Sequence, residues 1–420
     1  MHQLIILSSL AVVILTYLYI SLREHNYVNV LTPFVLLGVP SWYLLELAYG
    51  ALAGFDGSVF AYFYCYLTYA MGVVGTAVGY LVTPAKPLSI FVKFPKVRVP
   101  GLAFIFLGFA LLLYAPILIR FPHLLVSPRQ IYELTRSGFG IQFFLSSFAV
   151  YLGFVFLLFS SSLRRPAAYM FLLVSLAVLY LHGSKGQVLF FFLIGLYFFV
   201  FVKGWRFGLQ RLIVLGTVVS VMVIGLFYVT FSESAKADLA ISIAGYADYT
   251  RNAAMVIDDD ALDPQMGRLT LEGRLYTIVP RALVPDKPND YGAFWLVKRY
   301  FPGRFDLGTG APDMGLGVQY ADFGILTVVY CTFWAVLTGF AMKVLVTRLK
   351  HDPDAGSFML LLVLMQVPLI PTGGGGVPLV VYFVIAHFVK SLGRDLPKRG
   401  TEAVSPAMPM LEGQIVSNER

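Results

Sequence analysis

The sequence predicts an all-α, polytopic integral membrane protein. Of its 420 residues, 58% are hydrophobic and 13% are charged, and the mean hydropathy is +0.77. A soluble fold of this length could not shield so much apolar surface from water. The apolar residues are also grouped in runs of about 20, the length that an α-helix needs to cross a bilayer. The alternating ten-residue pattern of membrane barrel strands is absent.

Eleven apolar runs are candidate transmembrane helices, because unpaired backbone amides are too costly in hydrocarbon for other open structures. Eight runs lie within residues 1–231 and three within 315–391. The segment 232–314 between them is predicted to be a long, ordered loop outside the membrane, and 392–420 a disordered tail. The runs are residues 3–22, 28–49, 58–83, 100–119, 140–160, 167–182, 187–202, 212–231, 315–342, 356–371 and 375–391.

The positions of Lys and Arg predict the orientation of these helices. Basic residues gather in alternate short loops and after the last run, which marks the cytoplasmic side. The N-terminus and the long loop then lie outside, and the C-terminus lies inside. The net charge of +8 is therefore explained by orientation in the membrane rather than by nucleic acid as a partner.

The outer loop 120–139 departs from this pattern. It carries Arg120, Arg129 and Arg136 against the single acid Glu133. Because basic residues in a short outer loop oppose insertion, we expect these arginines to have a partner. Two interpretations stay open: ion pairs with acids of the long loop or with lipid phosphates, or a binding function.

Two stretches of the long loop are predicted to be helical. Residues 235–257 place Leu239, Ile243 and Tyr246 on one face, which suits a helix on the membrane surface or over the bundle. Residues 292–301 form a second short candidate that contains Trp295. Its aromatic side chains indicate either an interfacial anchor or a platform on which a sugar stacks.

Between them runs "GRLYTIVPRALVPDKP", residues 273–288. Its three prolines exclude a continuous helix and predict a stiff connector. This connector would hold Arg274, Arg281 and Lys287 at set positions, and such groups bind phosphate oxygens well. The segment therefore indicates a site for an anion such as a diphosphate. The alternative is a solvated loop whose arginines pair with the acidic run 258–260.

An acid also follows the long loop. In "GTGAPDMGLGVQYADFG", residues 308–324, Asp322 lies about two turns inside the ninth apolar run. An ionisable group at that depth is a functional candidate because it is costly to bury. Alternatively, an ion pair between Asp322 and an arginine of the 120–139 loop would explain the buried acid without a catalytic role.

These motifs resemble the Wzy-type polymerases of O-antigen and capsular polysaccharide repeat units. The resemblance lies in "IVPRALVPDKP" at 278–288, "GLGVQYADFG" at 315–324 and "HGSKG" at 182–186, where Lys185 replaces the usual arginine. Two Arg-x10-Gly spacings typical of the family are also present, Arg129 with Gly140 and Arg281 with Gly292.

The resemblance implies a GT-C-like fold in the bacterial inner membrane and a reaction at its periplasmic face. A glycan on undecaprenyl diphosphate would be transferred to a second lipid-linked repeat unit, with no cofactor and no metal. Membrane lipid and a chain-length regulator are the other partners that it implies. The catalytic residues predicted on this basis are Arg281, Arg274, Asp322 and Glu133, and the substrate-binding residues are Arg129, Arg136, Lys287, Lys185, Trp295 and Tyr320.

In this hypothesis the arginines stabilise the charge on the departing diphosphate, and Asp322 or Glu133 accepts the proton of the attacking hydroxyl. Two rival functions stay open. One is an O-antigen ligase or another lipid-linked glycan transferase, and the other is a transporter of lipid-linked oligosaccharides. A transporter predicts internal repeats and broken helices near the midplane, and no repeat is visible in the sequence.

Overall fold

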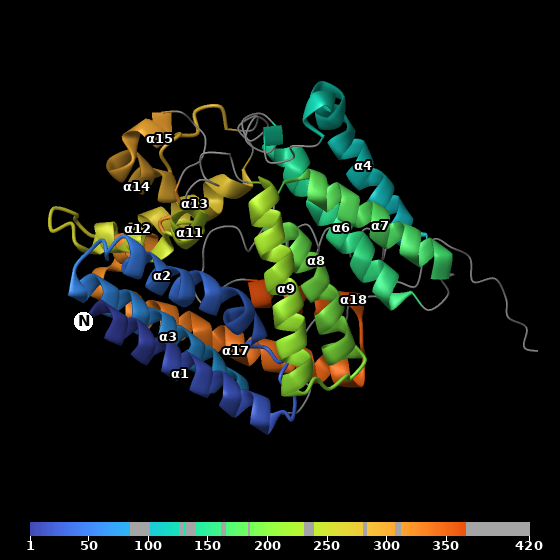
Figure 1. Ribbon diagram of the computed structural model, residues 1–420, viewed down its shortest axis with the longest axis horizontal. Helices are drawn as coiled ribbons and strands as arrows, with labels where there is room; N and C mark the ends of the chain where they lie inside the picture. Colours follow the sequence, from blue (N-terminus) through green and yellow to red (C-terminus); the bar gives the residue numbers. More distant parts are fainter. Residues whose placement is uncertain are drawn as a thin grey trace, which may run out of the picture.

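The computed structural model describes residues 1–84, 101–125, 130–131, 139–160, 165–183, 185–230, 239–279, 284–306 and 312–366. Within these ranges the chain is helical, with no strand. Long helices lie side by side in a bundle, and short helices of the outer loop gather at one end of it (Figure 1). The all-α prediction is therefore confirmed.

Ten of the eleven predicted runs coincide with helices, and the eleventh, 375–391, lies outside the described residues. Two runs contain π-helical turns, 28–49 and 187–202, and the turns in the first of them include Pro40. The helices are α1 (His2–Arg23), η1 (Phe34–Leu44), α2 (Leu45–Leu52), α3 (Val59–Val82), α4 (Leu102–Arg120), η2 (Pro122–Leu124), α6 (Gly140–Phe159), α7 (Arg165–Leu181), α8 (Lys185–Tyr197), η3 (Phe198–Val202), α9 (Leu209–Thr230), α16 (Gly317–Phe323), η4 (Gly324–Leu326), α17 (Thr327–His351) and α18 (Ala355–Gln366).

Six spans of the described chain are long and apolar enough to cross a membrane, and four further apolar helices are shorter. The lipid-facing character is visible on α1 and α4, where Leu15, Leu112 and Ile119 are large, apolar and exposed. Such a surface would be unstable in water. The protein is thus a multi-pass membrane protein, whereas the number of eleven crossings stays a prediction.

Helices α3 and α17 pack in close backbone contact. A Cβ atom added to Gly79 would lie 1.9 Å from the carbonyl oxygen of Val336, and one added to Gly339 would lie 2.0 Å from that of Thr76. The two backbones therefore touch, as small residues allow in membrane helix pairs. This contact joins the N-terminal helices to the helix that follows the long loop.

The long loop contains more helix than predicted. The single helix expected over 235–257 is wrong, since the chain breaks near Gly245 into α11 (Leu239–Ala244) and α12 (Tyr249–Ile257). The connector begins as helix α13 (Arg268–Ile278). Pro280 affects only the residue before it, and Val279 is accordingly extended.

The predicted helix at 292–301 is confirmed as α14 (Ala293–Tyr300), and α15 (Pro302–Asp306) follows it. These helices share a small apolar core of their own with α16. The core gives the outer loop an ordered structure, and its fully buried members are Val256, Leu269, Leu296, Val297, Met314 and Ala321.

Candidate functional site

Helix α12 fastens the outer loop to the membrane helices. Seven of its nine residues are buried. At its C-terminal end the carboxylate of Asp258 accepts hydrogen bonds from the backbone nitrogen and the hydroxyl of Ser58, at 2.7 and 2.5 Å. The side-chain nitrogen of Asn252 donates to the carbonyl of Asp313 at 2.9 Å. This helix therefore fixes the position of the loop above α3.

Arg251 of α12 points into the bundle. It is 6% exposed, and its guanidinium lies 3.5 Å from the ring centroid of Tyr49. Its Nε atom is 3.9 Å from the carboxylate of Glu46, which is 1% exposed and accepts a 2.6 Å hydrogen bond from Tyr62. Each charge reduces the cost of burying the other. This pair is a second link between the outer loop and the bundle.

Asp322 lies where the outer loop meets α17, in the short helix α16 rather than inside a continuous ninth helix. It is fully buried, and its two carboxylate oxygens accept hydrogen bonds from the backbone nitrogens of Leu269 and Thr270, at 2.9 and 2.7 Å. These nitrogens belong to the first turn of α13, where helical amides have no partner within the helix. Asp322 thus caps α13 and favours its N-terminus electrostatically.

Lys287 holds the other end of the same helix. Its ammonium donates to the carbonyl oxygens of Tyr276 and Val279, the latter at 3.2 Å, and lies 4.6 Å from the ring centroid of Tyr291. A cation at a helix C-terminus is stabilising. Asp322 and Lys287 were both predicted to contact substrate, but their charged groups bind the backbone at the two ends of α13.

Arg274 lies between these two caps. It is half-buried, and its guanidinium stands 6.0 Å from the ring centroid of Trp334 on α17. None of the carboxylates that the structure describes forms an ion pair with it. Leu271 and Leu275, on either side of it along the helix, are 59% and 54% exposed, so this face is not covered by described protein. Arg274 therefore remains available to an anion at the edge of the bundle.

The start of α14 requires glycine. Gly292 has a φ of +55°, and a Cβ there would lie 2.8 Å from the Cα of Gly273 on α13. Its backbone nitrogen donates to Glu272 at 3.2 Å. The glycine of the Arg281–Gly292 spacing thus serves the packing of two helices against each other.

The two aromatic candidates lie in different surroundings. Trp295 is half-buried, with the guanidinium of Arg268 5.3 Å from its ring centroid. Tyr320 packs edge-on against Tyr64, with 5.2 Å between the ring centroids, and lies between the core of the bundle and the small core of the outer loop. Their binding of sugar stays a prediction.

The acidic run 258–260 is not simply solvated. Asp258 binds Ser58, and Asp259 accepts from the hydroxyl of Tyr300 at 2.7 Å and pairs with Arg299 at 2.7 Å. The hydrogen bond from Tyr300, together with that from Arg299, holds the pKa of Asp259 below its ordinary value. The arginine that pairs with this run is thus Arg299 of α14, whereas the predicted alternative paired the run with arginines of the connector 273–288.

Four predicted site residues, Arg129, Glu133, Arg136 and Arg281, lie outside the described residues. Lys185 begins α8, and its side chain is also outside them. Among the described residues no group of three or more His, Cys, Asp or Glu could hold a metal ion.

Sequence reasoning missed Glu46 and Arg251. The signal for Glu46 was present, since an acid inside the apolar run 28–49 is costly enough to mark a candidate. Arg251 carried no such signal, because it follows an apolar stretch of an otherwise polar loop.

No protein-family model matches the chain, and no solved structure shows a significant match. Two curated relatives do match. The O-antigen polymerases of Salmonella typhimurium and Salmonella typhi are each 31% identical to it over 372 residues, which cover 87% of this chain and 90% of theirs. At this identity and coverage, the chain belongs to the O-antigen polymerase family.

Proposed function

We propose that this protein joins oligosaccharide repeat units carried on undecaprenyl diphosphate, at the periplasmic face of the bacterial inner membrane. In this proposal the N-terminus and the outer loop are periplasmic and the C-terminus is cytoplasmic. The observation that supports this proposal most directly is the placement of Arg274. It lies on a helix held at both ends, and no described carboxylate neutralises it. Its helix has an uncovered apolar face beside α17.

The chemistry follows from the leaving group. When the bond between a sugar and a diphosphate breaks, negative charge develops on the departing oxygen, and a fixed cation lowers the energy of that state. A guanidinium can contact two phosphate oxygens at once. The ring centroid of Trp334 lies 6.0 Å from the guanidinium of Arg274, and the caps on α13 limit the motion of the helix, so the charge is near its working position before the reaction.

The other predicted residues have graded roles in this proposal. Arg281 follows α13 directly in the sequence and would add a second cation, and Arg129 and Arg136 would hold the second lipid diphosphate. Asp322 and Lys287 position α13, because their charged groups are used on its backbone. Glu133 is then the predicted general base, in place of Asp322.

The test is polymerisation in vitro by purified protein supplied with lipid-linked repeat units, read as a ladder on a gel. Arg274→Ala is expected to slow chain growth about 10²–10³-fold, the loss typical of one such donor. Arg274→Lys keeps the charge but not the two-pronged contact, so an intermediate rate is expected.

The matched control is Arg304→Ala, which removes an exposed arginine of α15 from the same outer loop. It should leave the ladder unchanged. A ladder from Arg274→Ala as strong as that of the control would remove Arg274 from the reaction. A wild-type protein that transports lipid-linked units without extending them would favour the transporter alternative.

A further inference from the structure

Helix α13 has two apolar faces that point in opposite directions. On one face Leu269 is fully buried in the small core of the outer loop, and Gly273 packs against Gly292 of α14. On the opposite face Leu271 and Leu275 follow each other at the four-residue spacing of one helical stripe, and both are more than half exposed. This second face is not covered by the described part of the chain.

The exposed leucines lie beside an apolar surface of α17. Arg274 belongs to the same side of α13 as the leucines, and its guanidinium lies 6.0 Å from the ring centroid of Trp334. Around Trp334, α17 and the turn before it expose a contiguous stripe of large apolar side chains, which marks contact with a membrane. The stripe consists of Ile325, Leu326, Val329, Phe333, Leu337 and Phe340. The apolar face of α13 therefore continues a surface that lipid covers.

The contact with Trp334 also indicates the depth of α13 in the membrane. Helix α17 meets the outer loop at its first residue, Thr327, and Trp334 lies about two turns, or roughly 10 Å, along the helix from there. Val329 lies between these two levels and is 66% exposed, and Ile325, just before α17, is 69% exposed. Apolar side chains thus face outward on the loop side of Trp334 as well. The level at which Arg274 meets α17 is therefore inside the leaflet and not above it.

The charged residues of α13 suit a position at the membrane interface. They flank the leucine stripe, with Arg268 and Glu272 on one side, 3.9 Å apart, and Arg274 on the other. The long side chain of arginine can keep its charge at the level of the head groups while its stem lies against apolar surface. Tryptophan, which accompanies Arg274 here, is enriched at the same level.

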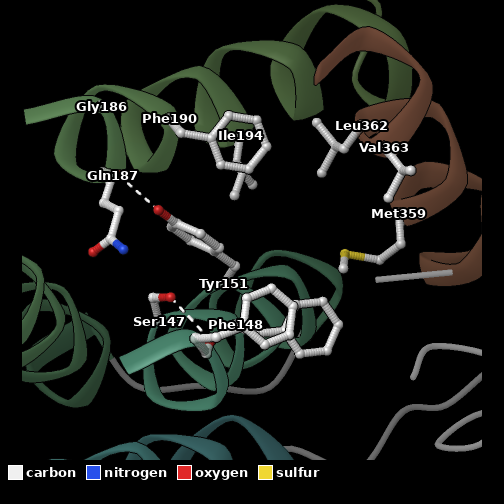
Figure 2. Close-up of a pocket in the computed structure, with 11 residues that line it drawn as sticks. Ser147, Phe148, Tyr151, Gly186, Gln187, Phe190, Ile194, Met359, Leu362 and Val363 are labelled. Carbon is white, nitrogen blue, oxygen red and sulfur yellow. Dashed lines mark hydrogen bonds between the residues drawn. The ribbon is translucent and has the colours of Figure 1, made fainter. Parts of the chain in front are cut away.

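Figure 2 shows a second apolar feature, a cavity of about 300 Å3 among α6, α8 and α18. Side chains such as Phe148, Ile194 and Leu362 line most of it. Nothing in this lining selects one occupant, because many apolar molecules would fit it. The face of α13 differs, since the exposed residues of α17 continue it and identify its neighbour.

We propose that α13 lies in the interfacial region of the adjoining leaflet, with Leu271 and Leu275 among the lipid chains and Arg274 at the level of the phosphates. The partner of this face is the phospholipid bilayer. A second copy of the chain would also cover two leucines, but exposed apolar residues are spread over α1, α4 and α17, as a surrounding bilayer requires. In the orientation proposed above, this leaflet is the outer one.

Spin labels on single cysteines measure this depth. Leu271→Cys and Leu275→Cys are labelled in the full-length protein in nanodiscs of phosphatidylcholine and phosphatidylglycerol. The native Cys65 and Cys331 are buried, and the wild-type protein checks that they do not react. Collisions of the label with oxygen, which concentrates in lipid, are compared with collisions with a water-soluble nickel chelate.

Two further variants supply the references. Val329→Cys reports the lipid-facing surface of α17, and Arg304→Cys reports the water-exposed surface of α15. We expect labels at 271 and 275 to resemble the label at 329, with an oxygen-to-nickel collision ratio about tenfold or more above that at 304. A ratio equal to that at 304 would place the face in water, and protection from both reagents would place protein over it. Either result would overturn the inference.

Photocrosslinking identifies the neighbour directly. Benzoylphenylalanine in place of Leu275 should form an adduct with phospholipid, and the same group in place of Arg304 should not. A crosslink from position 275 to a second copy of the chain, or to another segment of the same chain, with no lipid adduct would refute the proposal. Neither measurement needs a repeat-unit substrate, so the depth of α13 and the polymerase reaction can fail independently.

Discussion

Two neighbouring helices of the outer loop, α12 and α13, are fixed to the protein in opposite ways. Helix α12 is anchored by side chains of its own residues and of its C-cap, since Arg251 is buried beside Glu46 of α2 and Asp258 binds Ser58 at the start of α3. Helix α13 is held by groups from elsewhere, Asp322 at its start and Lys287 at its end, and of its residues 268–276 only Leu269 is buried.

The difference separates a helix that anchors the loop from a helix that presents side chains to a substrate. The polar side chains of α12 are used in contacts with the bundle and cannot bind a substrate, whereas α13 is capped by other segments and keeps its own side chains available. Arg251 and Arg274 are both arginines of the same loop, yet only Arg251 is buried against an acid. Their substitution should therefore affect different properties of the protein.

The largest expected effect is on stability, from Arg251→Met. Removing one partner of a buried ion pair leaves the other charge uncompensated and costs about 3–5 kcal/mol. The midpoint of thermal unfolding in detergent should fall clearly. In Arg251→Met combined with Glu46→Gln, part of the loss should return, because the orphaned charge is then removed as well.

Arg274→Ala is the matched comparison for this measurement, and it should unfold at the wild-type temperature while losing activity. If both single variants were destabilised equally, the distinction between an anchoring and a presenting helix would fail.

A smaller effect is expected from Asp322, and it separates two roles for this residue. Asp322→Ala removes the cap of α13 and should cost about 0.5–2 kcal/mol. Asp322→Asn keeps an oxygen that can accept from the backbone of Leu269 or Thr270 but cannot take a proton. Near-wild-type polymerisation by the asparagine variant is expected from a positioning role. Loss of the ladder with an unchanged melting temperature would restore Asp322 as a base.

The sequence predicted the bundle more accurately than the outer loop. An apolar run in a membrane must form a helix to satisfy its backbone hydrogen bonds. The runs 58–83 and 140–160 accordingly coincide with α3 and α6 within a residue or two. The outer loop has no such constraint. Three prolines suggested a connector over 273–288, although a proline restricts only itself and the residue before it.

The site was harder to predict because contacts between distant segments decide it. Asp322 was singled out correctly as a costly acid, but its partners are backbone amides of α13, which no side-chain pattern marks. Lys287 was chosen for its charge, which is used on two carbonyl oxygens. Only the three-dimensional structure distinguishes Asp322 and Lys287, whose charges cap α13, from Arg274, which caps no helix.

The smallest expected effect is on the stability of α14. Arg299 and Tyr300 of this helix bind Asp259, which lies in the loop before α13. The pKa of Asp259 is lowered in the folded protein, first by the hydrogen bond from Tyr300, so the contact stabilises the fold above the unfolded pKa of about 3.9 and is lost as pH falls through the folded pKa. Because the pair is near the surface, it contributes about 0–1 kcal/mol. Hydrogen exchange of α14, corrected for intrinsic rates, should be constant from neutral pH down to about 5 and rise below about 4. Asp259→Asn should lack this rise, and an identical rise in that variant would assign the acid sensitivity to another group.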